Sequence, residues 1–166
     1  MKIRLFGTAN DSIVDGPGIR YAVFVQGCTH NCKGCHNPKS HKMDGGFLKD
    51  TDEIFEEIKK NPLLDGVTFS GGEPFLQAKP LSELAIKIKE LGLNLYVYSG
   101  FTFEQLLLGA NEENGWMDLL KQADFLVDGK FEEDKKHYTL LFKGSENQRI
   151  IDVQKSLEEN KTIIIG

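Results

Sequence analysis

The stretch GVTFSGGEPFLQAKPLSELAIKIKELGLNLYVY, residues Gly66 to Tyr98, contains in one run the features that decide the fold. Its first residues, Gly66 to Phe69, predict a buried strand. Apolar residues then recur with the 3.6-residue period of a helix that stops at Gly92, namely Leu81, Leu84, Ala85, Ile88 and Leu91. Leu93 to Tyr98 is again strand-like. Strand, helix and strand in this order predict a parallel pair with the helix packed outside it.

The same alternation continues on both sides of this unit. Before it, Arg20 to Gln26 predicts the first strand, and Asp50 to Lys60 predicts a helix that Asp50 can cap. After it, Thr102 to Leu108 and Trp116 to Lys121 look helical, and Asp124 to Val127 predicts a fourth strand. Repeated β–α units favour a mostly parallel sheet with helices outside it.

The length of the chain limits how far this sheet can close. A complete eight-fold barrel usually needs about 250 residues, whereas this chain has 166. We therefore expect an α/β fold of the partial, open β/α barrel type, as a single domain over residues 1–166. Beyond Phe131 the pattern is weaker: Tyr138 to Phe142 and Thr162 to Ile165 are strand-like, and Val153 to Glu159 fits either helix or loop.

Composition excludes several classes of protein. The net charge is −5 and the lysines are interspersed with acidic residues, so no basic field for nucleic acid is expected. The residues after Met1 show no apolar stretch followed by a cleavage site, and no apolar run approaches the length of a membrane span. We expect a soluble, cytoplasmic protein that acts without nucleic acid or a membrane.

Unusual segments follow each predicted strand. A cysteine-containing loop follows the first, Ser70 to Pro74 follows the second, Ser99-Gly100 follows the third, and Asp128 to Lys130 follows the fourth. Ligands of parallel α/β sheets bind beyond the carboxyl ends of the strands. The pattern therefore predicts a cofactor site at this edge.

The three cysteines of the chain, Cys28, Cys32 and Cys35, have the spacing C-x3-C-x2-C. An odd, tightly clustered set cannot close into structural disulfides, so metal or redox chemistry is favoured. Three thiolates in a short loop can bind one face of a [4Fe–4S] cluster and leave the fourth iron open for a small molecule. Gly27 and Gly34 suit a backbone that turns sharply beside such a group.

Two other interpretations of this loop remain open. His30 or His36 can complete a zinc site with the three cysteines, and Cys32 with Cys35 can form a redox dithiol. Structural zinc sites normally take their ligands from two separated pairs, and the chain has no second cysteine pair.

The cysteine loop resembles the hallmark of the radical S-adenosylmethionine superfamily. Where that hallmark usually has an aromatic residue before the third cysteine, this chain has Gly34, and the following His36-Asn37-Pro38 is similar to the small activating-protein branch. The resemblance implies that Cys28, Cys32 and Cys35 bind three irons of one [4Fe–4S] cluster. S-adenosylmethionine would then bind the fourth iron.

The resemblance extends to the other segments and implies further cofactor contacts. The run Ser70-Gly71-Gly72-Glu73-Pro74 is similar to the motif that holds the amino group of S-adenosylmethionine, although by itself it also fits an ordinary strand-to-helix turn. Asp128 and Lys130 match an acid and a lysine directed at the cofactor, although a solvated strand end with a weak ion pair explains them equally well. The implied cofactor-binding residues are Gly34, Cys35, His36, Gly71, Gly72, Glu73, Asp128 and Lys130.

Two more stretches narrow the resemblance to one branch of activating proteins. Asp15-Gly16-Pro17-Gly18 is similar to a stretch of glycyl-radical activating enzymes. The runs Leu126 to Phe131 and Leu140 to Arg149 resemble the carboxyl-terminal signature of the activating proteins of anaerobic (class III) ribonucleoside-triphosphate reductase.

In that family an electron, from flavodoxin or ferredoxin, passes through the cluster and cleaves S-adenosylmethionine. The 5′-deoxyadenosyl radical that forms takes a hydrogen atom from a glycine of the reductase large subunit. No side chain is expected to act as a catalytic acid or base. The alternatives are an enzyme of the pyruvate formate-lyase activating type, a radical enzyme acting on a small molecule, and a zinc-binding interaction module.

Overall fold

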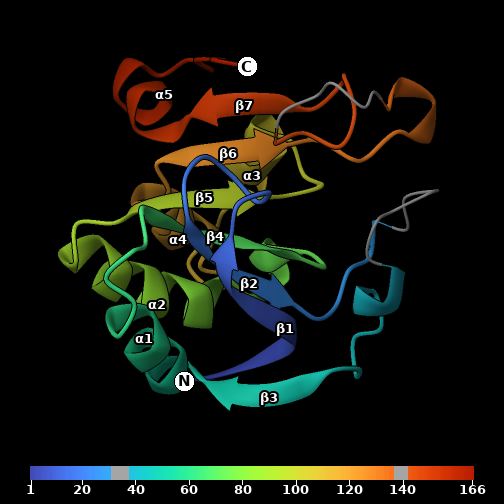
Figure 1. Cartoon of the computed structure of the whole chain (residues 1–166). Helices are drawn as coiled ribbons and strands as arrows, with labels where there is room; N and C mark the ends of the chain where they lie inside the picture. The colour runs from blue at the N-terminus through green and yellow to red at the C-terminus, as the bar shows by residue number, and fades with distance from the viewer. Residues whose placement is uncertain (31–37, 137–141) are drawn as a thin grey trace.

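The computed structural model describes residues 1–30, 38–136 and 142–166. Seven strands form one sheet in the order β3-β1-β2-β4-β5-β6-β7 (Figure 1). The strands are β1 Lys2–Ser12, β2 Arg20–Val25, β3 Phe47–Asp50, β4 Gly66–Gly71, β5 Asn94–Tyr98, β6 Phe125–Asp128 and β7 Arg149–Asp152. The four central strands β2, β4, β5 and β6 are parallel, and β1 and β7 pair antiparallel with their neighbours. The fold is therefore mixed α/β with a mostly parallel, open sheet; the predicted barrel-like curvature stays a prediction.

Within the described residues, five α-helices accompany the sheet: α1 Thr51–Lys59, α2 Ala78–Glu90, α3 Phe103–Gly109, α4 Trp116–Gln122 and α5 Val153–Glu159. Short 3-10 turns lie at Pro38–Ser40, Pro74–Gln77 and Glu133–Lys135. Helix α2 packs between α1 and α4, and α4 also contacts α3 and α5 (Figure 1). None of the helices in the described ranges is long and apolar enough to cross a membrane.

The predicted strand–helix–strand unit is confirmed as β4, α2 and β5. Helix α2 buries Leu81, Leu84, Ala85 and Ile88, and it ends where Gly92 adopts a φ of +80°. The predicted helix after Asp50 is α1, and the Asp50 carboxylate caps it by accepting a hydrogen bond from the backbone N–H of Asp52. The segment 153–159, which fitted either helix or loop, is helix α5.

The sequence prediction was wrong about where the sheet begins. The strand at Arg20 is the second, because β1 precedes it and pairs with it, and β3 was also missed. Strand β1 escapes a pattern search because it contains Gly7, Asn10 and Asp11, which are poor strand formers, and because two register irregularities interrupt its pairing with β2.

The last strand-like segments have different outcomes. Residues 163–166 pair with β7 through backbone bonds such as Ile165 N–H to Ile150 O at 2.8 Å, and Ile164 forms an isolated bridge with Ile151. Of the predicted strand Tyr138 to Phe142, residues 138–141 lie outside the described residues.

The core lies between the sheet and the helices. Alternate residues of the parallel strands face α1, α2 and α4 and are fully or almost fully buried, among them Val23, Val67, Phe69, Leu95 and Val97. Each such side chain contributes about 1.5–3 kcal/mol by leaving water. This apolar layer holds the four parallel strands in register, so that their carboxyl ends meet at one edge of the sheet.

The β1–β2 connection is held by a buried arginine. The Arg20 guanidinium donates to Thr68 Oγ1 at 2.8 Å and to the Pro17 carbonyl at 3.0 Å, and it lies 4.8 Å above the Tyr96 ring. Thr68 Oγ1 in turn donates to the Asp15 carbonyl at 2.5 Å. Burial lowers the pKa of Arg20, but a guanidinium remains charged in proteins. The Asp15 to Gly18 loop is thereby fixed against Thr68 of β4.

Candidate functional site

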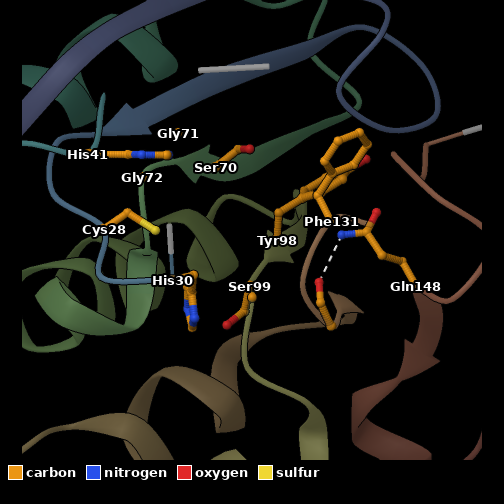
Figure 2. A pocket seen from close by; sticks show the side chains of 12 residues that line it. Cys28, His30, His41, Ser70, Gly71, Gly72, Tyr98, Ser99, Phe131 and Gln148 are labelled. Atoms are coloured by element: carbon orange, nitrogen blue, oxygen red, sulfur yellow. Dashed lines mark hydrogen bonds between the residues drawn. The ribbon is translucent and has the colours of Figure 1, made fainter. Parts of the chain in front are cut away.

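A pocket lies where the carboxyl ends of the parallel strands meet (Figure 2). The volume enclosed by the described residues is about 110 Å³. The strand ends contribute Ser70, Gly71, Gly72, Tyr98, Ser99 and Gly100. The remaining wall is formed by Cys28, His30, His41, Gly129, Phe131 and Gln148. The predicted convergence of four separate segments at this edge is thus found in one pocket.

The floor of the pocket is backbone because two glycines leave no room for side chains. Gly71 has a φ of +97°, and a Cβ there would lie 2.5 Å from the Val25 nitrogen. A Cβ on Gly72 would lie 2.4 Å from the Gly27 carbonyl oxygen. The N–H of Gly72 donates to Val25 O, and that of Glu73 to Gly27 O, each at 2.7 Å. The end of β4 and the start of the cysteine loop are therefore in direct backbone contact.

The two ends of the cysteine loop are joined at its base. The N–H of Gly27 donates to Ser40 O at 2.6 Å, and that of Cys28 donates to His41 O at 3.1 Å. The Gln26 side chain adds bonds from Nε2 to the carbonyls of Lys39 and Lys42 at 3.0 and 2.8 Å. This closure places the half-buried Cys28 in the pocket wall.

Four of the predicted site residues, Cys32, Gly34, Cys35 and His36, lie outside the described residues. Their assignment as cluster or cofactor ligands stays a prediction.

Glu73 is fully buried, and its side chain does not line the pocket. The carboxylate accepts hydrogen bonds from the Ser99 hydroxyl at 2.9 and 3.0 Å, from the Gly100 N–H at 2.8 Å and from the Phe75 N–H at 3.0 Å. It connects the end of β4 to the end of β5. The prediction that Glu73 meets the amino group of a cofactor remains a prediction.

Asp128 is also buried and bound by protein groups. It accepts from Arg149 Nε at 3.0 Å and Nη2 at 2.5 Å, and from the N–H of Phe103 at 2.7 Å. Arg149 also binds Glu104 at 2.6 Å. The hydrogen bonds that Arg149 donates to the two carboxylates, that to Asp128 first, raise the pKa of Arg149. The bond from Arg149 lowers the pKa of Glu104 to about 2. In the described structure, Asp128 thus joins β6 to β7 and to the start of α3.

Lys130 is exposed and does not line the pocket, whereas Gly129 between it and Asp128 does. The predicted cofactor contacts of Asp128 and Lys130 therefore stay predictions.

Comparison with known proteins gives the context for this pocket. The family model described as a 4Fe-4S single cluster domain matches residues 14–151, which include the three cysteines and every described wall of the pocket. The anaerobic ribonucleoside-triphosphate reductase-activating protein of Pasteurella multocida is 35% identical over 147 residues, covering 83% of this chain and 90% of the relative. The chain belongs to this family of reductase-activating proteins. The protein of the same name from Haemophilus influenzae is 32% identical over 148 residues, covering 83% of this chain and 90% of the relative. That from Escherichia coli K12 is 30% identical over 145 residues, covering 82% of this chain and 90% of the relative.

The resemblance of the carboxyl-terminal residues to this family can now be given a structural meaning. Gln148 donates from Nε2 to the Gly129 carbonyl at 2.9 Å (Figure 2), and its Oε1 accepts from the Gly144 N–H at 2.7 Å. Asn147 Nδ2 donates to the Lys130 carbonyl at 2.8 Å. These side chains hold the segment after β6 in place, so that Gly129 and Phe131 form one wall of the pocket.

Sequence reasoning gave no cofactor role to several pocket residues that the structure brings together. His30, His41, Tyr98, Phe131 and Gln148 all line the pocket. For His30 the available signal was its position two residues after Cys28. For Tyr98 it was the position at the end of a parallel strand, and burial raises the pKa of its hydroxyl above the ordinary value of 10, so that it stays protonated.

The described residues fit an iron–sulfur cluster with a small cofactor. Cys28 lines the same pocket as a strand end whose two glycines expose backbone to a ligand. A Cβ at Gly71 or Gly72 would collide with backbone atoms, so this bare edge is required by the packing itself.

Proposed function

We propose that the chain activates an anaerobic (class III) ribonucleoside-triphosphate reductase by generating a glycyl radical on the reductase large subunit. Its cofactors are one [4Fe–4S] cluster and S-adenosylmethionine. The observation that carries the proposal is the position of Cys28 in the same pocket as the Gly71–Gly72 edge. The names of the relatives and the cluster-domain match support the same activity.

The cysteines Cys28, Cys32 and Cys35 would hold the cluster, and the backbone of Gly34, Gly71 and Gly72 together with His36 would bind S-adenosylmethionine. When bound, these two cofactors supply the one-electron cleavage of the sulfonium bond and the removal of a hydrogen atom from a glycine of the partner.

The chain's own residues bind and orient the cofactors and exclude water. The closed base of the cysteine loop holds the backbone of Cys28 beside the end of β4. Phe131 gives the wall opposite the glycine edge an apolar side chain, and the protonated hydroxyl of Tyr98 offers a neutral hydrogen-bond donor at the pocket. No described side chain of the pocket is required to transfer a proton in this proposal.

The partners and setting belong to the same proposal. Flavodoxin or ferredoxin would deliver the electron, because the cluster needs a low-potential donor. The net charge of −5 supports a protein that acts without nucleic acid. We take residues 1–166 as one radical S-adenosylmethionine domain working in the cytoplasm and without a membrane.

Anaerobic reconstitution of wild type and Cys32→Ala tests the proposal. We expect about four irons and matching sulfide per wild-type chain. The wild type should also form 5′-deoxyadenosine with a chemical reductant, and it should produce a glycyl-radical signal in electron paramagnetic resonance when the reductase is added. Cys32→Ala should lose all three. Stoichiometric zinc with no cleavage in the wild type would refute the proposal, and cleavage without a radical on the reductase would refute its choice of partner.

A further inference from the structure

We infer that His30 is a positioning residue, which anchors the cysteine loop by its buried contact with Glu73, and that Glu73 serves this anchor and is not the counter-charge of the cofactor's ammonium group. The inference rests on the proposed function for what the loop holds. The contact between His30 and Glu73 itself forms in the protein without any cofactor.

The contact between the two side chains is close and buried. Nε2 of His30 lies 2.5 Å from Oε1 of Glu73, and the side chains are 6% and 0% exposed. The ring of Phe101 meets the His30 ring edge to face, with centroids 4.5 Å apart and planes at 75°. A Cβ on Gly100 would lie 2.5 Å from the His30 ring, so a glycine is needed there for the histidine to reach the carboxylate. In Figure 2 the His30 ring and the Ser99 side chain lie side by side.

The remaining capacity of the Glu73 carboxylate is taken by other protein donors. A carboxylate offers about four lone-pair positions. Oε1 accepts from His30, Ser99 and Gly100, and Oε2 accepts from Ser99 and Phe75. A buried carboxylate with this many donors is already compensated for its loss of water. Because the Ser99 hydroxyl has one hydrogen to share between the two oxygens, four protein donors match the four positions, and the Glu73 side chain does not line the pocket.

These contacts place the first cluster ligand between two fixed points of the loop. On one side, Gly27 and Cys28 are bonded to Ser40 and His41. On the other, His30 is bonded to Glu73 two residues after Cys28. The anchor thus joins the cysteine loop, the end of β4 and the end of β5 in one network, and the Cys28 thiol is oriented before a cluster binds.

Two substitutions at position 30 separate the hydrogen bond from the bulk of the side chain. His30→Gln keeps an N–H donor of similar reach, whereas His30→Leu keeps an apolar side chain against Phe101 without a donor. Losing a hydrogen bond to a buried charge costs about 1.5–3 kcal/mol. We therefore expect anaerobic iron release to a chelator to be about tenfold faster or more in His30→Leu, with His30→Gln within about threefold of wild type. Equal iron-release rates in all three proteins would overturn the inference that His30 anchors the loop.

A double-mutant cycle with Glu73→Gln tests the direct connection in the metal-free protein. Each single substitution changes the unfolding equilibrium constant by some factor relative to wild type. If the two side chains interact, the product of the factors for His30→Leu and Glu73→Gln differs from the factor for the double variant by about fivefold or more. Independent effects would overturn the inference. If Glu73→Gln does not fold, the comparison of His30→Leu with His30→Gln decides alone.

The affinity for S-adenosylmethionine then separates an anchor from an ammonium ligand. The cluster-loaded Glu73→Gln protein should bind S-adenosylmethionine no more weakly than His30→Leu does, and the double variant no more weakly than either. An affinity loss of about thirtyfold in Glu73→Gln with none in His30→Leu would show a direct charge contact and overturn the inference. The double-mutant cycle measures unfolding of the metal-free protein, so its result does not depend on whether the wild type cleaves S-adenosylmethionine. Failure of the proposed function and failure of the anchor are therefore distinguishable.

Discussion

Substitution of Gly72 by alanine directly tests the contact between the strand end and the cysteine loop. Its new methyl group would lie 2.4 Å from the Gly27 carbonyl oxygen and 2.8 Å from the Gly27 carbonyl carbon. Both are backbone atoms, which cannot swing aside as a side chain does. Relief requires the two segments to separate, which stretches the 2.7 Å bond from the Glu73 N–H to Gly27 O.

The expected loss of stability follows from these two effects. Overpacking costs about 1–3 kcal/mol, and the weakened hydrogen bond adds about 1 kcal/mol. The sum of about 2–4 kcal/mol corresponds to a fall in melting temperature of roughly 4–16 °C for a chain of this size. Gly7→Ala in β1 is the matched control, because a Cβ there has no atom within 4 Å and Gly7 has no positive φ. Its effect should stay within about 0.5 kcal/mol.

Urea unfolding of the metal-free protein, followed by the fluorescence of Trp116, measures the difference. Trp116 is the only tryptophan of the chain and packs against Phe75 and Phe101 close to the pocket. We also expect Gly72→Ala to retain less iron after reconstitution than Gly7→Ala. If Gly72→Ala unfolds at the same urea concentration as Gly7→Ala and holds as much iron, the close approach of the two segments does not shape the site.

Two further predictions concern the segments that enclose the pocket. Gln148→Ala removes the bonds to Gly129 and Gly144, so we expect S-adenosylmethionine to bind the cluster-loaded protein about three- to tenfold more weakly. Gln154→Ala loses two bonds to carbonyls at the carboxyl end of α4 and should keep wild-type affinity. An equal loss of affinity in both variants would argue against a pocket-specific role. Because the hydrogen bond from Arg149 lowers the pKa of Glu104 from 4.5 to about 2, its stabilisation is complete above pH 4.5 and is lost as the pH falls through 2. Half of the Glu104 side chain is exposed, so Glu104→Gln should cost less than about 1 kcal/mol at pH 7, measured by urea unfolding. This cost should shrink as the pH falls from 4.5 through 2. A pH-independent difference would contradict this cause.

The regular elements of the parallel part of the sheet were predictable because their signals are local. The 3.6-residue period of α2, the glycine at its end and the capping aspartate of α1 each act over a few residues, and the structure confirms all three. Strand β1 was not predictable in this way. Its residues are weak strand formers, and its pairing with β2 and β3 comes from residues far away in the chain.

The same difference between local and long-range signals applies to the candidate site. The cysteine spacing and the glycine pair are properties of short sequences, and they pointed to the edge of the sheet where the structure has this pocket. The partners of the buried carboxylates are not local. Glu73 is bound by donors near positions 30 and 99, and Asp128 by Arg149, so neither pairing has a signature in its own segment.

The sequence by itself thus determined the succession of the parallel strands and their helices, the family resemblance and the residues suited to a cluster. Periodicity, turn chemistry and ligand spacing all act between near neighbours. Only the tertiary structure decided which donors surround each buried acid. A carboxylate removed from water must take its hydrogen bonds from the groups within about 3 Å, and packing of the whole sheet selects those groups. For this chain, that selection surrounds Glu73 with donors from the cysteine loop and from the end of β5.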